Sequence, residues 1–206
     1  MKTKCAAAPG LAGGYTLLEL MTVVCIAGVV ASVAMPSLDA LAMNERRTAV
    51  VNNLLATLLL ARSETLKRGG RPLVVCGLND GNGNGTLDPA EQRCAGHDWT
   101  DGWMLGTWND ADGDATVDAD EFEPLRVFQT GASGRLTVTA GNFTASPPVA
   151  PAGTMLIKAF GRRTSNGTIT ICDRRGPPDA RGVIVSSLGR ARVSSRRADG
   201  TPLRCP

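Results

Sequence analysis

Residues 14–38 read GYTLLELMTVVCIAGVVASVAMPSL, and this stretch decides the fold of the 206-residue chain. Its last 19 residues, from Leu20 to Leu38, contain no charged side chain. A helix needs about 20 consecutive apolar residues to cross the hydrocarbon core of a bilayer. We therefore expect one membrane-spanning segment over about residues 17–38, with Cys25 as one of its small apolar side chains.

The residues up to Gly14, MKTKCAAAPGLAGG, are few and basic, and they end in two glycines. A secretory signal peptide is basic, then apolar, and is cut after its apolar part. Here a cut after Gly14 would precede the apolar run and leave the membrane helix on the mature protein. The sequence therefore predicts a leader over residues 1–14, and Cys5 would be removed with it.

Gly14-Tyr15-Thr-Leu-Leu-Glu19 closely resembles the prepilin cleavage motif of type IV pilins and type II secretion pseudopilins. In that family a prepilin peptidase cuts after the glycine and methylates the new amino terminus, which implies these events at Gly14 and Tyr15. Tyr15 stands where the family usually has Phe, and Pro36 matches the family's helix kink. The resemblance implies a single-pass protein of the bacterial inner membrane with a periplasmic carboxy-terminal domain, which then joins a pilus or pseudopilus.

Glu19 places a carboxylate at the start of the apolar run. A charge inside a membrane segment is costly and usually has a specific partner. The family resemblance implies that this partner is the amino group of Tyr15 on a neighbouring subunit, so that the paired charges align pilins or pseudopilins in the filament. The alternative is an interfacial Glu19 that reaches the lipid headgroups from the helix end.

Beyond Pro36 the apolar residues recur at the spacing of an amphipathic helix. They are Leu38, Leu41, Val50, Leu54, Leu55, Leu58 and Leu59. Because Gly69-Gly70 is a helix stop signal, we expect one helix over residues 15–70. The expected fold class is α+β, with this long N-terminal helix packed on an antiparallel β-sheet domain over residues 71–206.

The sheet domain is predicted from short β-rich runs that alternate with turn residues. These runs lie near 71–77, 101–108, 125–129, 134–139, 154–160, 167–172, 181–187 and 191–195. Several motifs in them resemble the FimT/GspH branch of the pilins. They are WTDGW at 99–103, PLRVF at 124–128, TICDRRG at 170–176, ARGVIVS at 180–186 and LGRARV at 188–193.

Four cysteines remain for this domain, an even number that fits disulfides in an oxidising compartment. We expect the pairs nearest along the chain, Cys76–Cys94 and Cys172–Cys205, although four cysteines allow three connectivities. The alternative is a zinc site at Cys76, Cys94 and His97, which lacks the usual CxxC spacing.

Charge is unevenly distributed, since residues 79–128 hold twelve acidic and two basic side chains. Within them, one loop has oxygen-bearing side chains at the spacing of a twelve-residue calcium loop. They are Asp80, Asn82, Asn84, Thr86, Asp88 and Glu91. Gly85 occupies the position of the sharp turn, so the spacing predicts a structural calcium site.

A second loop repeats this spacing, but Ala115 replaces the glycine of the sharp turn, which weakens the match. Its oxygen-bearing residues are Asp110, Asp112, Asp114, Thr116, Asp118 and Glu121. Strands rather than paired helices flank both loops, so neither is an EF-hand. The alternative for both loops is a solvated polar turn, because Asn, Asp and Gly favour turns in any case.

The carboxy-terminal part is basic, and seven arginines fall within residues 174–197. Guanidinium groups suit phosphate contacts. Gly189-Arg190-Ala191-Arg192 resembles the GRxR motif associated with DNA binding in FimT-type minor pilins. We expect Arg190 and Arg192 to bind DNA without sequence preference, helped by Arg196 and Arg197. The alternatives are a solvated basic edge that discourages strand pairing, or one that docks on an acidic neighbour.

Two hypotheses follow for the whole protein. The first is a minor type IV pilin that contacts DNA during uptake. The second is a structural or priming subunit of a pilus or a type II secretion pseudopilus, with no ligand beyond its neighbours. An enzyme is not expected, because the lone His97 lies in a polar loop and no nucleophile–base spacing or phosphate loop occurs.

Overall fold

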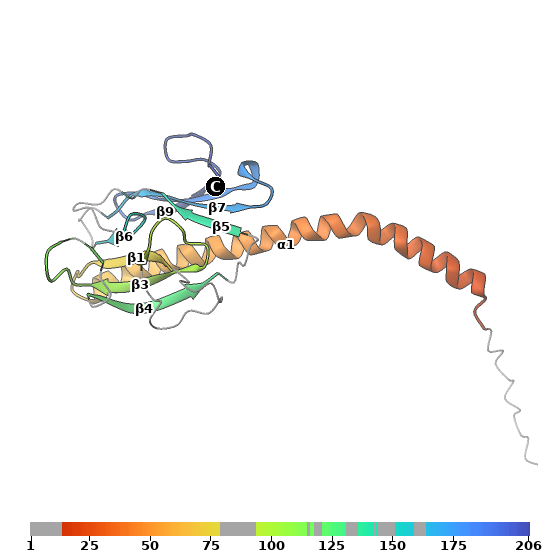
Figure 1. Cartoon of the computed structure of the whole chain (residues 1–206), viewed down its shortest axis with the longest axis horizontal. Coiled ribbons are helices and arrows are strands. Elements are labelled where there is room, and N and C mark those ends of the chain that lie inside the picture. The colour runs from red at the N-terminus through yellow and green to blue at the C-terminus, as the bar shows by residue number, and fades with distance from the viewer. Residues whose placement is uncertain are drawn as a thin grey trace, which may run out of the picture. The chain divides into compact units, whose positions relative to one another are not determined.

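The computed structural model describes residues 14–78, 94–114, 116–117, 121–130, 136–141, 143, 151–158 and 164–206. In these ranges one long helix precedes a set of short strands, which confirms the α+β class (Figure 1). The elements are α1 (Leu17–Lys67), β1 (Leu73–Leu78), β2 (Cys94–Ala95), β3 (Gly102–Trp108), β4 (Phe122–Gln129), β5 (Leu136–Ala140), β6 (Met155–Ile157), β7 (Gly167–Asp173), the 3-10 turn η2 (Pro177–Asp179), β8 (Arg181–Val185) and β9 (Ala191–Ser194).

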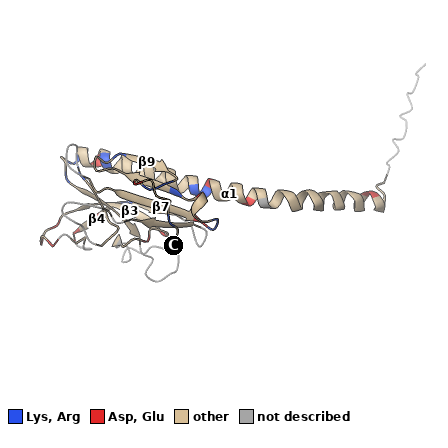
Figure 2. Cartoon of the chain, turned by 90° about the horizontal axis from the view of Figure 1, so that it is seen from above, with Lys and Arg blue, Asp and Glu red and all other residues tan. Residues whose placement is uncertain are grey.

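The chain divides into two compact units, Met1–Ala42 and Met43–Pro206, and α1 contributes to both. In the first unit, thirteen large apolar side chains between Leu17 and Leu41 are each more than half exposed. Figure 2 shows no Lys or Arg on this part of the helix. The helix is long and apolar enough to cross a membrane, and it continues through position 36 without a break.

In the second unit, α1 buries one face with the three- and four-residue spacing of an amphipathic helix. The buried residues are Met43, Arg47, Val50, Val51, Leu54, Thr57, Leu58, Ala61 and Thr65. Of the apolar residues predicted to form this face, Val50, Leu54 and Leu58 are confirmed. Leu59 is 69% exposed, because it lies about 100° around the helix from the buried Leu58 and outside the buried face.

The strands form two antiparallel sheets beside this part of α1 (Figure 1). Sheet A has the order β2-β1-β3-β4, and sheet B has the order β5-β7-β8-β9. In sheet A, β1 pairs with β6 through Leu73–Val75 and with β2 through Gly77–Leu78. Because both pairings use the edge of β1 that faces away from β3, β6 and β2 lie end to end.

The main core lies where α1 meets the inner faces of both sheets. Leu54 and Leu58 of α1 belong to one buried cluster with Leu105 of sheet A and Ile171 of sheet B. All the buried apolar residues of the described ranges lie at or beyond Met43. A domain that begins at Met43 therefore keeps the whole core, and we expect it to fold without the first unit.

Two disulfides join Cys76 to Cys94 and Cys172 to Cys205, as the sequence predicts. The first pair rules out zinc ligation by Cys76 and Cys94, because a disulfide sulfur is no thiolate ligand. The second attaches the carboxy-terminal segment to sheet B. Leu203 packs there in a small cluster with Cys172 and Ala180.

Candidate functional site

The amino-terminal motif lies at the start of α1. Gly14, Tyr15 and Glu19 are exposed. The Glu19 amide donates to the hydroxyl of Thr16 over 3.2 Å. Thr16 therefore caps the helix, and its T-x-x-E spacing to Glu19 is that of a capping box. This local signal explains why the helix begins at Leu17 and places a carboxylate in its first turn, where the helix dipole favours negative charge.

Arg190 and Arg192 flank the start of β9, which is an edge strand of sheet B. The turn before β9 is tight: the Gly189 amide donates to the Ser186 carbonyl over 2.8 Å, and Gly189 has a φ of 73°. Arg192 lies opposite Ile184 of β8. Both arginines are exposed, and within the described part of the chain neither guanidinium group makes a hydrogen bond or ion pair.

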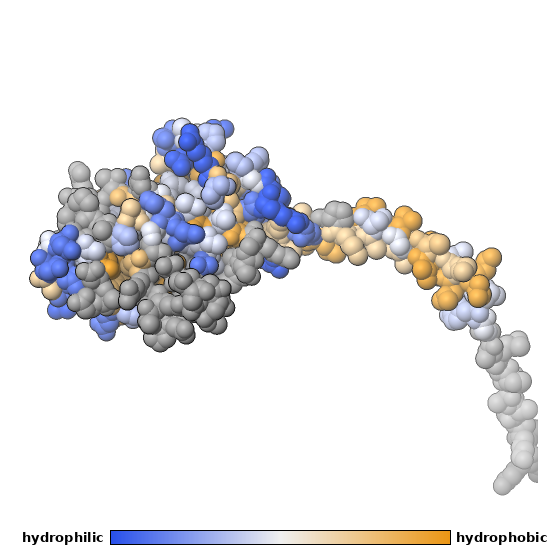
Figure 3. Space-filling view, in the orientation of Figure 1, coloured by the Kyte–Doolittle hydropathy of each residue, from blue (hydrophilic) through white to orange (hydrophobic). Residues whose placement is uncertain are grey.

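Arg196 and Arg197 belong to a hairpin that follows β9. Arg196 forms a bridge with Pro202, and the Arg197 amide donates to the Thr201 carbonyl over 2.9 Å. The Arg196 guanidinium also donates to the Gly200 carbonyl over 3.2 Å. Both Arg196 and Arg197 are exposed. We call Arg190, Arg192, Arg196 and Arg197 the arginine surface. Figure 3 shows hydrophilic residues gathered on this carboxy-terminal end of the molecule.

Sequence reasoning missed a buried ionic network between α1 and the turn after β7. The side chain of Asp173 is fully buried, and that of Arg47 is 7% exposed. Asp173 accepts from Arg175 over 2.6 Å, and its Oδ2 lies 3.5 Å from Nη1 of Arg47. The oxygen of Asn44 accepts from both arginines, over 3.0 Å and 2.9 Å. Arg47 also donates to the Asp179 carbonyl.

The hydrogen bond from Arg175 holds the pKa of Asp173 below its usual value, although burial acts in the opposite direction. Arg47 occupies a buried position of the helix face, so its guanidinium needs these acceptors. Helical periodicity could have indicated that position 47 lies on the buried face. The sequence could not indicate which groups accept from Arg47, because Asp173 is 126 residues away along the chain.

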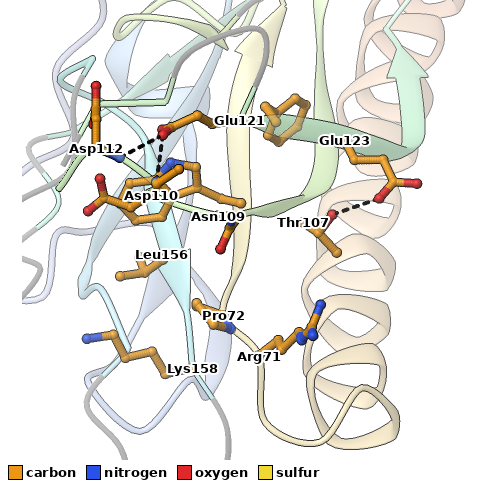
Figure 4. Close-up of a pocket in the computed structure, with 13 residues that line it drawn as sticks. Arg71, Pro72, Thr107, Asn109, Asp110, Asp112, Glu121, Glu123, Leu156 and Lys158 are labelled. Atoms are coloured by element: carbon orange, nitrogen blue, oxygen red, sulfur yellow. Dashed lines mark hydrogen bonds between the residues drawn. The ribbon is translucent and has the colours of Figure 1, made fainter. Parts of the chain in front are cut away.

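The second acidic loop brings three carboxylates together. Oxygen atoms of Asp110, Asp112 and Asp114 lie within 4.8 Å of one another. Glu121 reaches across the loop, and its Oε1 accepts from the amides of Ala111 and Asp112 over 2.6 Å and 3.3 Å (Figure 4). Its other oxygen, Oε2, is buried and has no hydrogen-bond partner among the residues that the structure describes. Oxygens that bind one Ca²⁺ at 2.3–2.6 Å are at most about 5 Å apart, so this spacing is compatible with calcium.

The structure describes only some of the other residues predicted to bind calcium. The backbone amide of Thr116 donates to Asp114 over 2.6 Å, and the Thr116 carbonyl accepts from Trp108 over 3.1 Å. Ala115 and Asp118 lie outside the described residues, as does the whole first loop from Asp80 to Glu91. The second loop lines a groove of about 1090 Å³ that also includes Arg71 and Lys158 (Figure 4).

Residues 50–189 match the family described as type II transport protein GspH. Among proteins with curated functions, none matches the chain in sequence. In structure the chain is similar to the type IV minor pilin FimU of Pseudomonas aeruginosa in two crystal forms. The first has 20% identity and a TM-score of 0.49, covering 76% of this chain and 96% of that chain. The second has 20% identity and a TM-score of 0.46, covering 74% and 98%.

Proposed function

Because the chain belongs to the GspH/FimT family of type IV pilin-like proteins, we propose that it is a FimT-type minor pilin that binds DNA. In this proposal α1 anchors the subunit in the inner membrane and assembles with other pilins, and the second unit lies in the periplasm. The two disulfides support an oxidising compartment.

Assembly would depend on the exposed amino-terminal end of α1. The apolar side chains between Leu17 and Leu41 need a lipid or helix environment, because they are exposed in the single chain. A prepilin peptidase would cut after Gly14 and methylate Tyr15. The amino group of Tyr15 would then pair with Glu19 of a neighbouring subunit, since a carboxylate at this depth needs a partner.

DNA binding would use the arginine surface. The observation that supports this part is the exposure of Arg190 and Arg192, whose guanidinium groups have no partner in the part of the chain that the structure describes. Two exposed arginines at the edge of one sheet, with no partner among the described residues, can reach the phosphates of a single strand or duplex. The surface contains no element that enters a groove to read bases. Binding should therefore be independent of sequence and sensitive to salt.

The test is DNA binding by the Met43–Pro206 domain, measured by fluorescence anisotropy across a salt series. With four phosphate contacts, the logarithm of the binding constant should fall with the logarithm of the salt concentration with a slope of roughly −3 to −4. Replacing Arg190 and Arg192 together by Ala should remove about two contacts, reduce the magnitude of the slope by about 2, and abolish most binding at physiological salt.

The matched control is Arg46→Ala/Arg71→Ala, which removes the same charge from exposed positions elsewhere. If both double variants weaken binding equally, the interaction is only a net-charge effect. If the unaltered domain does not bind DNA even at low salt, the alternative holds, a type II secretion pseudopilin or a purely structural minor pilin.

The acidic loop supports a second role, structural calcium binding, in addition to assembly. The clustered oxygens of Asp110, Asp112 and Asp114 favour it, as does the buried oxygen of Glu121, which has no partner in the described part of the chain. A cation would neutralise carboxylates that repel one another in the metal-free loop. The first loop, Asp80 to Glu91, is proposed as a second site on its sequence spacing alone.

Calcium at about 100 times its dissociation constant should stabilise the domain by about 2.7 kcal/mol per site. For a domain of this size, that corresponds to a rise of roughly 5–10 °C in melting temperature. Asp110→Asn/Asp112→Asn should lose the contribution of the second loop, whereas magnesium should give little shift in the unaltered domain. Equal melting temperatures with chelator and with millimolar calcium would contradict the proposal.

A further inference from the structure

The outer face of sheet B contains a polar groove. Most of the residues that line it do not belong to the arginine surface. Along β5 and β7 the inward side chains, such as Val138 and Ile169, belong to the main core. The alternate residues Thr139, Thr168 and Thr170 line a groove of about 510 Å³. Since strand side chains alternate between faces, these threonines present hydroxyl groups on the side opposite the core.

The carboxy-terminal segment forms the second wall of this groove with Arg197, Asp199 and Arg204. Its position is fixed by the Cys172–Cys205 disulfide and by Leu203. A Cβ atom on Gly182 would approach the Leu203 side chain to 2.9 Å, so glycine leaves the space in which the segment lies on sheet B.

The residues that line the groove carry net positive charge, because they include two arginines, Arg197 and Arg204, and one aspartate, Asp199. Arg204 is exposed, and among the described residues its guanidinium group has no hydrogen-bond or ion-pair partner. Asp199 is the acidic residue of the lining, but its Oδ1 accepts from the amide and hydroxyl of Thr201 over 2.9 Å and 2.6 Å. One oxygen of the carboxylate is therefore engaged within the hairpin turn, and its negative charge acts on Arg197. Arg204 is the arginine of the lining that remains available.

His97 lies at the edge of the groove. Its Nδ1 is 2.8 Å from the Ala140 carbonyl, which can only accept, so Nδ1 donates and the ring is held in place. The lining thus combines guanidinium groups, hydroxyl groups, one oriented imidazole and the small residues Gly141 and Gly167. This set is rich in donors and lacks a large aromatic side chain on which a base could stack.

We propose that this groove is a phosphate subsite, which takes a backbone phosphate of the DNA strand that the arginine surface contacts. Arg204 and Arg197 bind the phosphate oxygens, and the hydroxyl of Thr168 donates to them. The inference rests on the proposed DNA binding and extends it from the edge strand β9 to the outer face of β5 and β7. It adds two residues, Arg204 and Thr168, that no motif in the sequence indicates.

The experiment compares Arg204→Ala and Thr168→Val with the exposed control Arg71→Ala in the Met43–Pro206 domain. Loss of one phosphate contact should reduce the magnitude of the salt slope by about 0.9 on duplex DNA and weaken binding about five- to tenfold at 0.1 M salt. We expect this for Arg204→Ala, a smaller loss for Thr168→Val, and no change for Arg71→Ala.

A second measurement locates the contact directly. Amide chemical shifts of Gly141 and Thr168 should move when a short oligodeoxynucleotide is added to the labelled domain, and this movement should disappear in Arg204→Ala. Binding that depends on Arg190 and Arg192 but is indifferent to Arg204 and Thr168 would overturn this inference alone. Absence of DNA binding by the unaltered domain would overturn the proposed function as well.

Discussion

Replacing Asp173 by Ala is expected to lower the free energy of unfolding of the Met43–Pro206 domain by about 3–5 kcal/mol. The reason is the charge left behind: Arg47 is buried, and Asp173 is its buried anionic partner, 3.5 Å away. Arg175 would lose its 2.6 Å contact in the same change. Because small domains are stable by only about 5–15 kcal/mol, this single substitution removes a large share of the total. Urea unfolding followed by circular dichroism measures it.

Asp179→Ala is the matched control, because Asp179 belongs to the same network but its side chain is 40% exposed. We expect a loss of less than about 1 kcal/mol there, since exposed ion pairs contribute little. A double replacement, Arg47→Met/Asp173→Leu, should recover much of the stability, because it removes both buried charges together. Equal losses for Asp173→Ala and Asp179→Ala would contradict the assignment of a buried network.

The same network predicts how stability depends on pH. The pKa of Asp173 is lowered in the folded protein, mainly by its hydrogen bond with Arg175. The stabilisation that ionised Asp173 gives to the folded domain is therefore complete above its pKa in the unfolded chain, about 3.9. It is lost as the pH falls through the lower pKa of the folded protein. The difference in unfolding free energy between the unaltered domain and Asp173→Asn should shrink below about pH 4. A difference that stays constant down to pH 2 would contradict this linkage.

Local signals account for what the sequence could predict about the fold. The uncharged run from Leu20 to Leu38, the Gly69-Gly70 stop and the alternating strands each depend on neighbouring residues. The helix and the main strands were accordingly found within a few residues of their observed ends. β2 was missed because a strand of two residues has no period to detect. The cysteine pairs were correct because each cysteine joins its neighbour in sequence.

Features made by distant segments could not be predicted in the same way. Arg47 reads as one more polar residue of an amphipathic helix, and nothing near it in sequence indicates Asp173 as its partner. The phosphate subsite joins Thr168 of β7 to Arg204, and only the folded carboxy-terminal segment brings them to one groove. By contrast, a short motif is enough to predict a DNA-binding role for Arg190 and Arg192, and that role stays a prediction. The structure shows that both side chains are exposed at the edge strand β9.

Removing the Cys172–Cys205 disulfide, with both cysteines replaced by Ser, is expected to weaken stability and DNA binding together. The bond closes a loop with a sequence separation of 33 residues, so its loss should cost about 3–4 kcal/mol. It also attaches the last residues of the chain, including Arg204, to sheet B. Without that bond Arg204 is held less firmly, and ordering it on DNA costs conformational entropy. Affinity should fall toward that of the Arg204→Ala variant.

The other disulfide separates these two effects. Cys76–Cys94 lies in sheet A and spans 18 residues, so Cys76→Ser/Cys94→Ser should cost about 3 kcal/mol of stability as well. The arginine surface and the phosphate subsite lie on sheet B and its carboxy-terminal segment, and DNA affinity should therefore stay unchanged at a temperature where the domain is folded. If the Cys172–Cys205 and Cys76–Cys94 variants bind DNA with equal affinity, the carboxy-terminal disulfide is not needed to position the arginines that contact DNA. A loss confined to the Cys172–Cys205 variant would mean that this disulfide positions the phosphate contacts as well as stabilising the fold.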